Sequence, residues 1–110
     1  MMKKIRNILK RGFYNKEIEY SILQNMIRED SNIVLLDVRN VQEFSEGHLL
    51  GALNIPLGEL EDKVSLLIPN NGQTIVVYCQ RGIKSKAAVN LLIEMGYTNV
   101  YELKGGLDLI

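Results

Sequence analysis

The chain contains very few of the residues that cross-link a small protein. Among its 110 residues are one cysteine, one histidine, two prolines and no tryptophan. A single cysteine cannot close an intrachain disulfide, and one cysteine with one histidine cannot supply the four side-chain ligands of a structural zinc site. We therefore expect one domain held by its hydrophobic core, in a reducing, cytoplasmic setting and without a metal or cofactor.

An excess of charge and a long apolar run are also missing. The formal net charge is zero, and no apolar run approaches the ~18 residues of a membrane span. Residues 1–16 hold six Lys and Arg and no acid, which leaves seven basic and 13 acidic residues, a net charge of −6, for residues 17–110. Because the body is acidic and the basic start lacks the apolar stretch of a secretory signal, we expect no nucleic-acid partner, no transmembrane segment and no export.

The basic N-terminal segment 1–16 differs in composition from the domain proper, which we place at 17–110. Helical spacing recurs among its apolar residues Ile5, Ile8, Leu9 and Phe13. One interpretation is a basic helix that binds anionic lipid or RNA. The other, which we favour because short basic starts are common, is an ordinary terminal helix or arm that packs on the domain.

Strand and helix patterns alternate along the domain. Near-continuous apolar runs, typical of strands covered on both faces, occur at 33–38 and 74–78. Shorter strand patterns occur at 52–55 and 99–103. Apolar residues three and four apart predict helices over 17–29, 41–46, 57–67 and 84–95, the last capped by Gly96. This alternation predicts an α/β fold with a mostly parallel central sheet flanked by helices on both faces.

The single cysteine directly follows the second apolar run, at the kind of strand end where ligands gather in open parallel sheets. The segment from Cys79 leads straight into a helix, so its backbone N–H groups, the helix dipole, Arg81 and Lys84 favour an anion at its centre. A thiolate is such an anion, and we expect a pKa below the ~8.5 of free cysteine. Gly82 permits a positive φ or a close backbone approach. These features together speak against the alternative of a merely buried cysteine.

The segment Cys79-Gln80-Arg81-Gly82-Ile83-Lys84-Ser85 resembles the active-site loop C-x-x-G-x-[RK]-S of the rhodanese-like sulfurtransferases. The resemblance covers most of the chain, and the chain looks most like the small single-domain rhodaneses. Other short motifs in matching order and spacing are Asp37-Val38-Arg39, Glu43-Phe44, Gly47-His48-Leu49, Gly51-Ala52, Asn54-Ile55-Pro56, Gly96-Tyr97 and Gly105-Gly106.

The resemblance implies that Cys79 takes sulfur from a donor such as thiosulfate, becomes a persulfide, and passes the outer sulfur to a nucleophilic acceptor. The N–H groups of Gln80 to Ser85 would stabilise the charged outer sulfur. Arg81 and Lys84 either attract an anionic donor or are solvated surface cations. Because no second cysteine can resolve the persulfide, we expect an external acceptor: a small thiol, cyanide or a partner protein's cysteine.

Two further residues are expected to support the site. Asp37 and Arg39 form a turn-fixing polar pair at a strand end, with Asp37 accepting from loop N–H groups and Arg39 pairing with Glu43. The only histidine, His48, could form a catalytic pair with the cysteine. The resemblance instead implies a structural role in a turn, which we favour.

The chain departs from the common family pattern at two positions. Lys84 stands where Arg is frequent, which keeps the charge and loses the planar fork. The chain also ends four residues after Gly106 without the aromatic residue that often follows this glycine pair. We expect this to expose some core or to shorten the edge beside the loop, with consequences for partner choice.

Three other functions compete with sulfur transfer. Cysteine phosphatases hold an oxyanion in a similar loop, but their pattern has Arg six positions after the cysteine, where this chain has Ser85. A thioredoxin-type reaction needs a C-x-x-C motif, which is absent. A non-enzymatic docking or regulatory module remains as the alternative, although such versions of the domain usually lose the cysteine.

Overall fold

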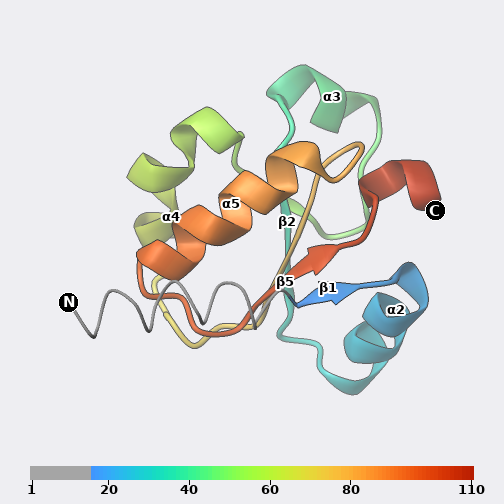
Figure 1. The fold of residues 1–110 in the computed structure, drawn as a ribbon, viewed down its shortest axis with the longest axis horizontal. Coiled ribbons are helices and arrows are strands. Elements are labelled where there is room, and N and C mark those ends of the chain that lie inside the picture. The colour runs from blue at the N-terminus through green and yellow to red at the C-terminus, as the bar shows by residue number, and fades with distance from the viewer. Residues whose placement is uncertain (1–15) are drawn as a thin grey trace.

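The computed structural model describes residues 16–110, so the helix expected within 1–15 lies outside the described residues (Figure 1). A five-stranded sheet forms the centre, in the order β1-β5-β4-β2-β3, and all neighbouring strands are parallel. The strands are β1 (Glu17–Ile18), β2 (Val34–Asp37), β3 (Leu53–Asn54), β4 (Ile75–Tyr78) and β5 (Val100–Leu103). The expected α/β fold with a parallel sheet is confirmed.

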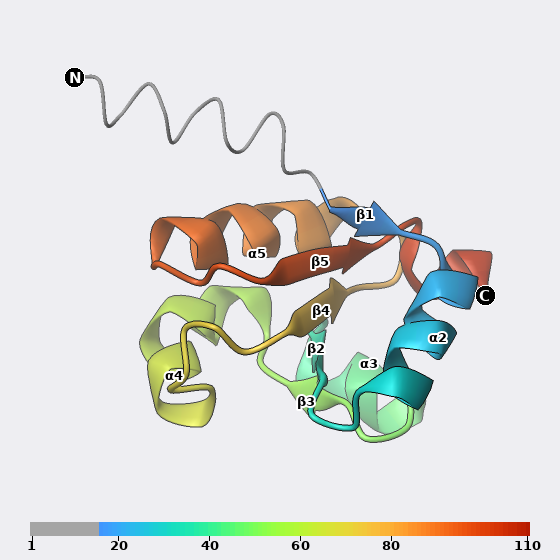
Figure 2. The same cartoon turned by 90° about the horizontal axis from the view of Figure 1, so that it is seen from below.

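Helices cover both faces of this sheet, and Figure 2 shows α2 on the opposite side of the strands from α4 and α5. The helices are α2 (Tyr20–Glu29), α3 (Val41–Glu46), α4 (Leu60–Leu67) and α5 (Ile83–Glu94), with 3-10 turns η1 (Leu57–Glu59) and η2 (Gly106–Leu109). Gly96, just beyond α5, has a φ of +98°, which confirms the expected left-handed cap.

Strand β4 shows why its sequence is almost continuously apolar. Ile75 and Val77 pack in one core with buried residues of α4 and α5, whereas Val76 and Tyr78 pack in a second core with Leu23 of α2. All four strand residues are fully buried. Alternate side chains therefore serve two different cores, and no position of the strand faces solvent.

The helix predicted to begin at residue 17 begins three residues later. Glu17 and Ile18 instead form β1, a two-residue edge strand in parallel register with Glu102 and Leu103. Two residues are too few to show the alternating pattern of a strand. The helical spacing of the residues that follow therefore led to a predicted helix that included Glu17 and Ile18. Among the apolar residues that predicted this helix, only Leu23 is fully buried. Ile22, its neighbour in the same pattern, is 46% exposed.

The segment predicted as one helix over 57–67 divides into η1 and α4. Leu57, Leu60 and Val64 face the core as expected. Leu67 is 47% exposed, however, and Ile68 is buried in its place. A tighter 3-10 turn at the start rotates the later side chains relative to a continuous α-helix, because it has fewer residues per turn.

The carboxyl ends of β2, β4 and β5 lie at one edge of the sheet, and the chain's last turn covers part of it. The N–H of Leu107 donates to the carbonyl of Cys79 (3.1 Å), and the N–H of Asp108 donates to that of Gln80 (3.0 Å). The edge beside the cysteine loop is therefore covered by η2. The turn includes Gly106 itself, whereas Leu109 and Ile110 at its end are 66% and 54% exposed. The expectation that the end of the chain exposes core or shortens this edge stays a prediction.

Candidate active site

The cysteine loop curls around its own sulfur. Cys79 follows β4 directly and is only 3% exposed. Its Sγ accepts hydrogen bonds from the backbone N–H groups of Gly82 (3.1 Å) and Ser85 (3.4 Å). Gly82 is the N-cap of α5 and has a φ of +89°, a left-handed conformation that turns the loop into the helix. The sulfur therefore lies at a cluster of N–H donors beside a helix start.

The electrostatics of this cluster favour the thiolate. Burial raises the pKa of the Cys79 thiol, but hydrogen bonds with the Ser85 hydroxyl and with the N–H groups of Ser85, Gly82 and Arg81 lower it, so that the pKa lies below its ordinary value. A lower pKa increases the thiolate fraction at neutral pH, and the thiolate is the nucleophilic form. The expected activation of the cysteine thus has a geometric basis.

Two glycines allow the loop and the last turn to pack backbone against backbone. A Cβ on Gly82 would lie 3.3 Å from the backbone N of Gly105, and one on Gly106 would lie 2.3 Å from the carbonyl oxygen of Cys79. Gly106 also has a φ of +63°. A side chain at position 106 would therefore push the C-terminal turn away from the loop that holds the sulfur.

The remaining loop side chains point to different surroundings. Gln80 bridges two neighbours: its Oε1 accepts from Arg39 Nη1 (3.2 Å), and its Nε2 donates to Asp108 Oδ1 (2.6 Å). The side chains of Ile83 and Lys84 are exposed.

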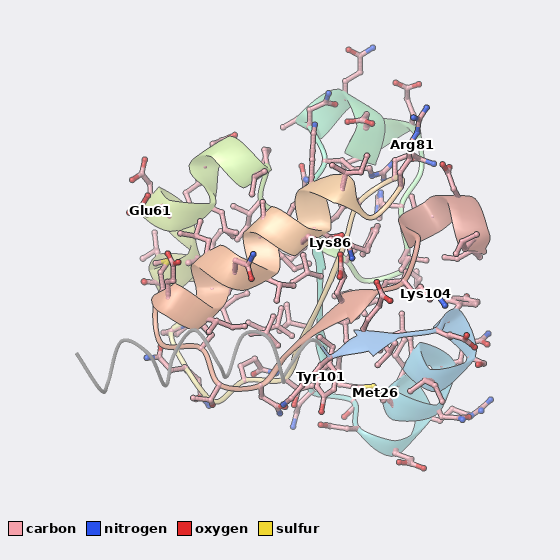
Figure 3. The ribbon with its side chains drawn as sticks, viewed as in Figure 1. Met26, Glu61, Arg81, Lys86, Tyr101 and Lys104 are labelled. Atoms are coloured by element: carbon pink, nitrogen blue, oxygen red, sulfur yellow. The ribbon has the colours of Figure 1, made fainter. Side chains whose placement is uncertain are left out.

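Arg81 belongs to the same loop and projects from its surface, as Figure 3 shows. Its side chain is 77% exposed, and its Nε lies 3.9 Å from Asp108 Oδ2. Both loop cations, Arg81 and Lys84, therefore lie at the surface of the loop that buries the sulfur. A direct contact of either with a donor remains a prediction.

Asp37 and Arg39 form a buried ion pair beside the loop. Asp37 Oδ2 and Arg39 Nη2 are 2.8 Å apart, with side-chain exposures of 0% and 5%. The same Nη2 donates to the carbonyl of Gly47 (2.6 Å), and the N–H of Arg39 donates to Asp37 Oδ1 (2.9 Å). The hydrogen bond from Arg39 to Gln80 connects this ion pair to the cysteine loop.

The expected polar pair is therefore present, but its partners differ from those predicted. Arg39 pairs with Asp37, and the prediction that it pairs with Glu43 was wrong. Glu43 closes a capping box with Asn40 at the start of α3. Asp37 accepts from its own turn and from the guanidinium, since both lie within reach of its two carboxylate oxygens.

His48 has a structural environment. Its ring stacks on Phe44 with centroids 3.6 Å apart, and its Nδ1 lies 2.7 Å from the Phe44 carbonyl oxygen. The ring therefore fixes the turn after α3, as the resemblance implied. The hydrogen-bond partners of the Cys79 sulfur come from residues of its own loop.

A buried carboxylate that the sequence did not predict lies behind the sulfur. Glu102 of β5 is 2% exposed, and its Oε2 accepts a hydrogen bond from Ser85 Oγ (2.7 Å). Its Oε1 lies 3.2 Å from Lys86 Nζ, which also lies 3.1 Å from Glu17. Figure 3 shows Lys86 between α5 and β5. The only signal in the sequence was an acid within the strand pattern at 99–103.

Two features are absent from residues 16–110. Within residues 16–110, no group of three or more His, Cys, Asp or Glu side chains is placed to hold a metal ion. In the same range, no helix combines the length and apolar character needed to cross a membrane.

The fold and the loop together define a class: parallel α/β domains in which a loop at a strand end directs its N–H groups at a cysteine sulfur. The family model of the rhodanese-like domain matches residues 19–110, and the chain belongs to that family. The thiosulfate sulfurtransferase PspE of Escherichia coli (strain K12) is 42% identical over 72 residues, which are 66% of this chain and 68% of PspE.

Other relatives place the domain in different contexts. The human single-domain sulfurtransferase TSTD1 has a TM-score of 0.77 at 26% identity, over 86% of this chain and 93% of TSTD1. A tRNA uridine(34) hydroxylase of Buchnera aphidicola is 33% identical over 87 residues, but the match covers only 28% of that protein. PspE and TSTD1, which both consist largely of this domain, are named sulfurtransferases, and this supports sulfur transfer as the general activity.

Proposed function

We propose that this chain transfers sulfane sulfur, from thiosulfate or another persulfide donor to a thiophilic acceptor, through a persulfide on Cys79. The observation that supports this most strongly is the buried sulfur with N–H donors from Gly82 and Ser85 at 3.1 and 3.4 Å. Such a cluster stabilises negative charge where it develops, and it is already in place before a donor arrives.

The proposed reaction has two displacement steps and needs no cofactor. In the first, the Cys79 thiolate attacks the outer sulfur of thiosulfate, the S–S bond of thiosulfate breaks, and sulfite leaves with the electron pair. The product is a persulfide whose outer sulfur carries the charge. In the second, the acceptor attacks this outer sulfur, the persulfide S–S bond breaks, and Cys79 is regenerated as a thiolate.

The acceptor in this scheme comes from outside the chain. Cys79 is the only cysteine, so an internal thiol cannot resolve the persulfide. A small thiol, cyanide or the cysteine of a partner protein is therefore the proposed acceptor. A reducing, cytoplasmic setting belongs to the same proposal, because it keeps a lone thiol reduced.

Docking without catalysis is the second candidate. It is favoured by one observation: the matched region makes up only 28% of a relative that is named for a different activity. Substitution of Cys79 by Ser separates the two functions, since docking uses the surface of the domain and sulfur transfer uses the sulfur.

The test is a steady-state assay with thiosulfate and cyanide, in which thiocyanate is measured for the wild type and for Cys79→Ser. We expect thiocyanate formation from the wild type and none above background from the variant. If the wild type forms no thiocyanate from thiosulfate or an organic persulfide while Cys79 reacts readily with an alkylating agent, the proposal is wrong and docking becomes the better account.

A further inference from the structure

One hydroxyl group lies between the Cys79 sulfur and a buried carboxylate. Ser85 Oγ is 3.5 Å from Cys79 Sγ and 2.7 Å from Glu102 Oε2. Ser85 is fully buried and Glu102 is 2% exposed, so water does not compete for these contacts. The Ser85 hydroxyl is therefore a hydrogen-bond partner of both the Cys79 sulfur and the Glu102 carboxylate.

The sharing differs between the two protonation states of Cys79. When Cys79 is a thiol, its S–H can donate to Ser85 Oγ while the hydroxyl donates to Glu102, so every group has a partner. When Cys79 is a thiolate, the hydroxyl can turn to the sulfur only by leaving the carboxylate. The hydrogen bond to Glu102 is the shorter one and is strengthened by the carboxylate's charge, so the hydroxyl favours the carboxylate as its acceptor.

The charges around Glu102 do not remove this conflict. On β1, Glu17 stands opposite Glu102 in the register, and on β4 the residue opposite is Val77, which is apolar. From α5, Lys86 approaches both carboxylates, at 3.1 and 3.2 Å. One cation is thus divided between two carboxylates, and the group of three retains a net negative charge.

We propose that Glu102 is a positioning residue that competes with the sulfur for the Ser85 hydroxyl, weakens the hydrogen bond by which that hydroxyl favours the thiolate, and thereby restrains thiolate formation at Cys79. The loop N–H groups favour the thiolate and Glu102 opposes it, so the reactivity of the cysteine is set by the balance of the two. The inference goes beyond the proposed function, because it concerns the ionisation of the cysteine whether or not a donor is bound.

The test compares Glu102→Gln with a matched control, Glu17→Gln. Both substitutions remove one carboxylate that pairs with Lys86, but only Glu102 contacts Ser85. Because the chain has one cysteine, thiolate absorbance in the ultraviolet and the rate of alkylation by iodoacetamide both report on Cys79 alone. Each is measured across a range of pH on the reduced full chain.

We expect the midpoint of ionisation to move to lower pH in Glu102→Gln and to stay in place in Glu17→Gln. For each pH unit of that movement, alkylation below the midpoint becomes about tenfold faster. In a Ser85→Ala background the same substitution should lose most of its effect. A merely structural role of Glu102 would change the limiting rate at high pH and leave the midpoint unchanged.

An unchanged or raised midpoint in Glu102→Gln overturns the proposal, and so does an equal movement in Glu17→Gln. If Glu102→Gln does not fold, as judged by circular dichroism, Glu102→Asp takes its place. The shorter side chain keeps the charge but withdraws it from the hydroxyl, so its midpoint should also fall, and an unchanged midpoint overturns the proposal. None of these measurements uses a sulfur donor, so the outcome is independent of whether sulfur transfer is confirmed.

Discussion

Replacement of Gly106 by Ala should release the cysteine loop from the C-terminal turn. A Cβ at this position would lie 2.3 Å from the carbonyl oxygen of Cys79 and 2.7 Å from that of Gln80. Both obstacles are backbone atoms, so rotation of a side chain cannot relieve the contact. The turn must move, and the hydrogen bonds that Leu107 and Asp108 donate to the loop must lengthen.

The size of the effect follows from two contributions. The left-handed conformation of residue 106, with φ of +63°, costs a residue with a Cβ about 1–2 kcal/mol. Overpacking against the loop backbone adds about 1–3 kcal/mol. The free energy of unfolding should therefore fall by about 2–5 kcal/mol. This is a large fraction of the stability of a typical small domain, which is about 5–15 kcal/mol.

Gly51→Ala is the matched control for this substitution. Gly51 also has a positive φ, +79°, but nothing lies within 4 Å of the position of its Cβ. Both variants restrict the unfolded chain equally, so the difference between them isolates the contact with the loop. Because the chain has no tryptophan, urea unfolding is followed by circular dichroism.

We expect Gly106→Ala to lose about 1–3 kcal/mol more than Gly51→Ala, and to change the alkylation rate of Cys79, which Gly51→Ala leaves unchanged. Equal losses of stability, together with an unchanged alkylation rate, would refute the close approach of turn and loop.

Three further outcomes follow from the same contacts. Asp108→Asn keeps a partner for Gln80 but removes the charge beside Arg81. Because such a surface pair is worth about 0–1 kcal/mol, the KM for thiosulfate should fall by up to about fivefold at low salt and by less at high salt. An effect that persists at high salt would contradict this. In Arg39→Lys, the lysine cannot reach Asp37, Gly47 and Gln80 together. Urea unfolding should therefore show a fall of about 1–3 kcal/mol in the free energy of unfolding. An unchanged value would show that the guanidinium of Arg39 is dispensable. Burial raises the pKa of Cys79, but hydrogen bonds with Ser85, Gly82 and Arg81 outweigh it and lower that pKa. Alkylation of Cys79 should therefore rise at lower pH in the folded protein than in urea, and coincident alkylation curves would count against this. The wild type should also gain stability over Cys79→Ser as the pH rises from the folded pKa to the unfolded one.

The sequence predicted the site best where short stretches of chain determine it. The apolar run of β4, the cysteine that follows it, Gly82 and the helix of α5 are contiguous, so one segment contains the strand, the loop and the N–H donors. The family resemblance of this segment agreed with the physical argument from the helix start. Local chain geometry was sufficient for this part of the site.

Contacts between distant segments were not predictable in the same way. Glu102 meets Ser85 only because β5 lies beneath α5, and its role is invisible in a strand pattern that shows merely one acid. Asp108 meets Gln80 because the glycine pair lets the last turn approach the loop. The pairing of Arg39 with Glu43 was also not as predicted, because the folded turn places the Asp37 carboxylate against the guanidinium.

The central claim is that Cys79 accepts and releases one sulfur atom, and intact mass spectrometry tests it most directly. Reduced protein is measured before and after incubation with thiosulfate, alongside Cys79→Ser, and again after addition of cyanide. The account predicts that the wild type gains the mass of one sulfur, that cyanide removes it, and that the variant gains nothing. A wild type that gains no sulfur from thiosulfate or an organic persulfide, although Cys79 is readily alkylated, would contradict it.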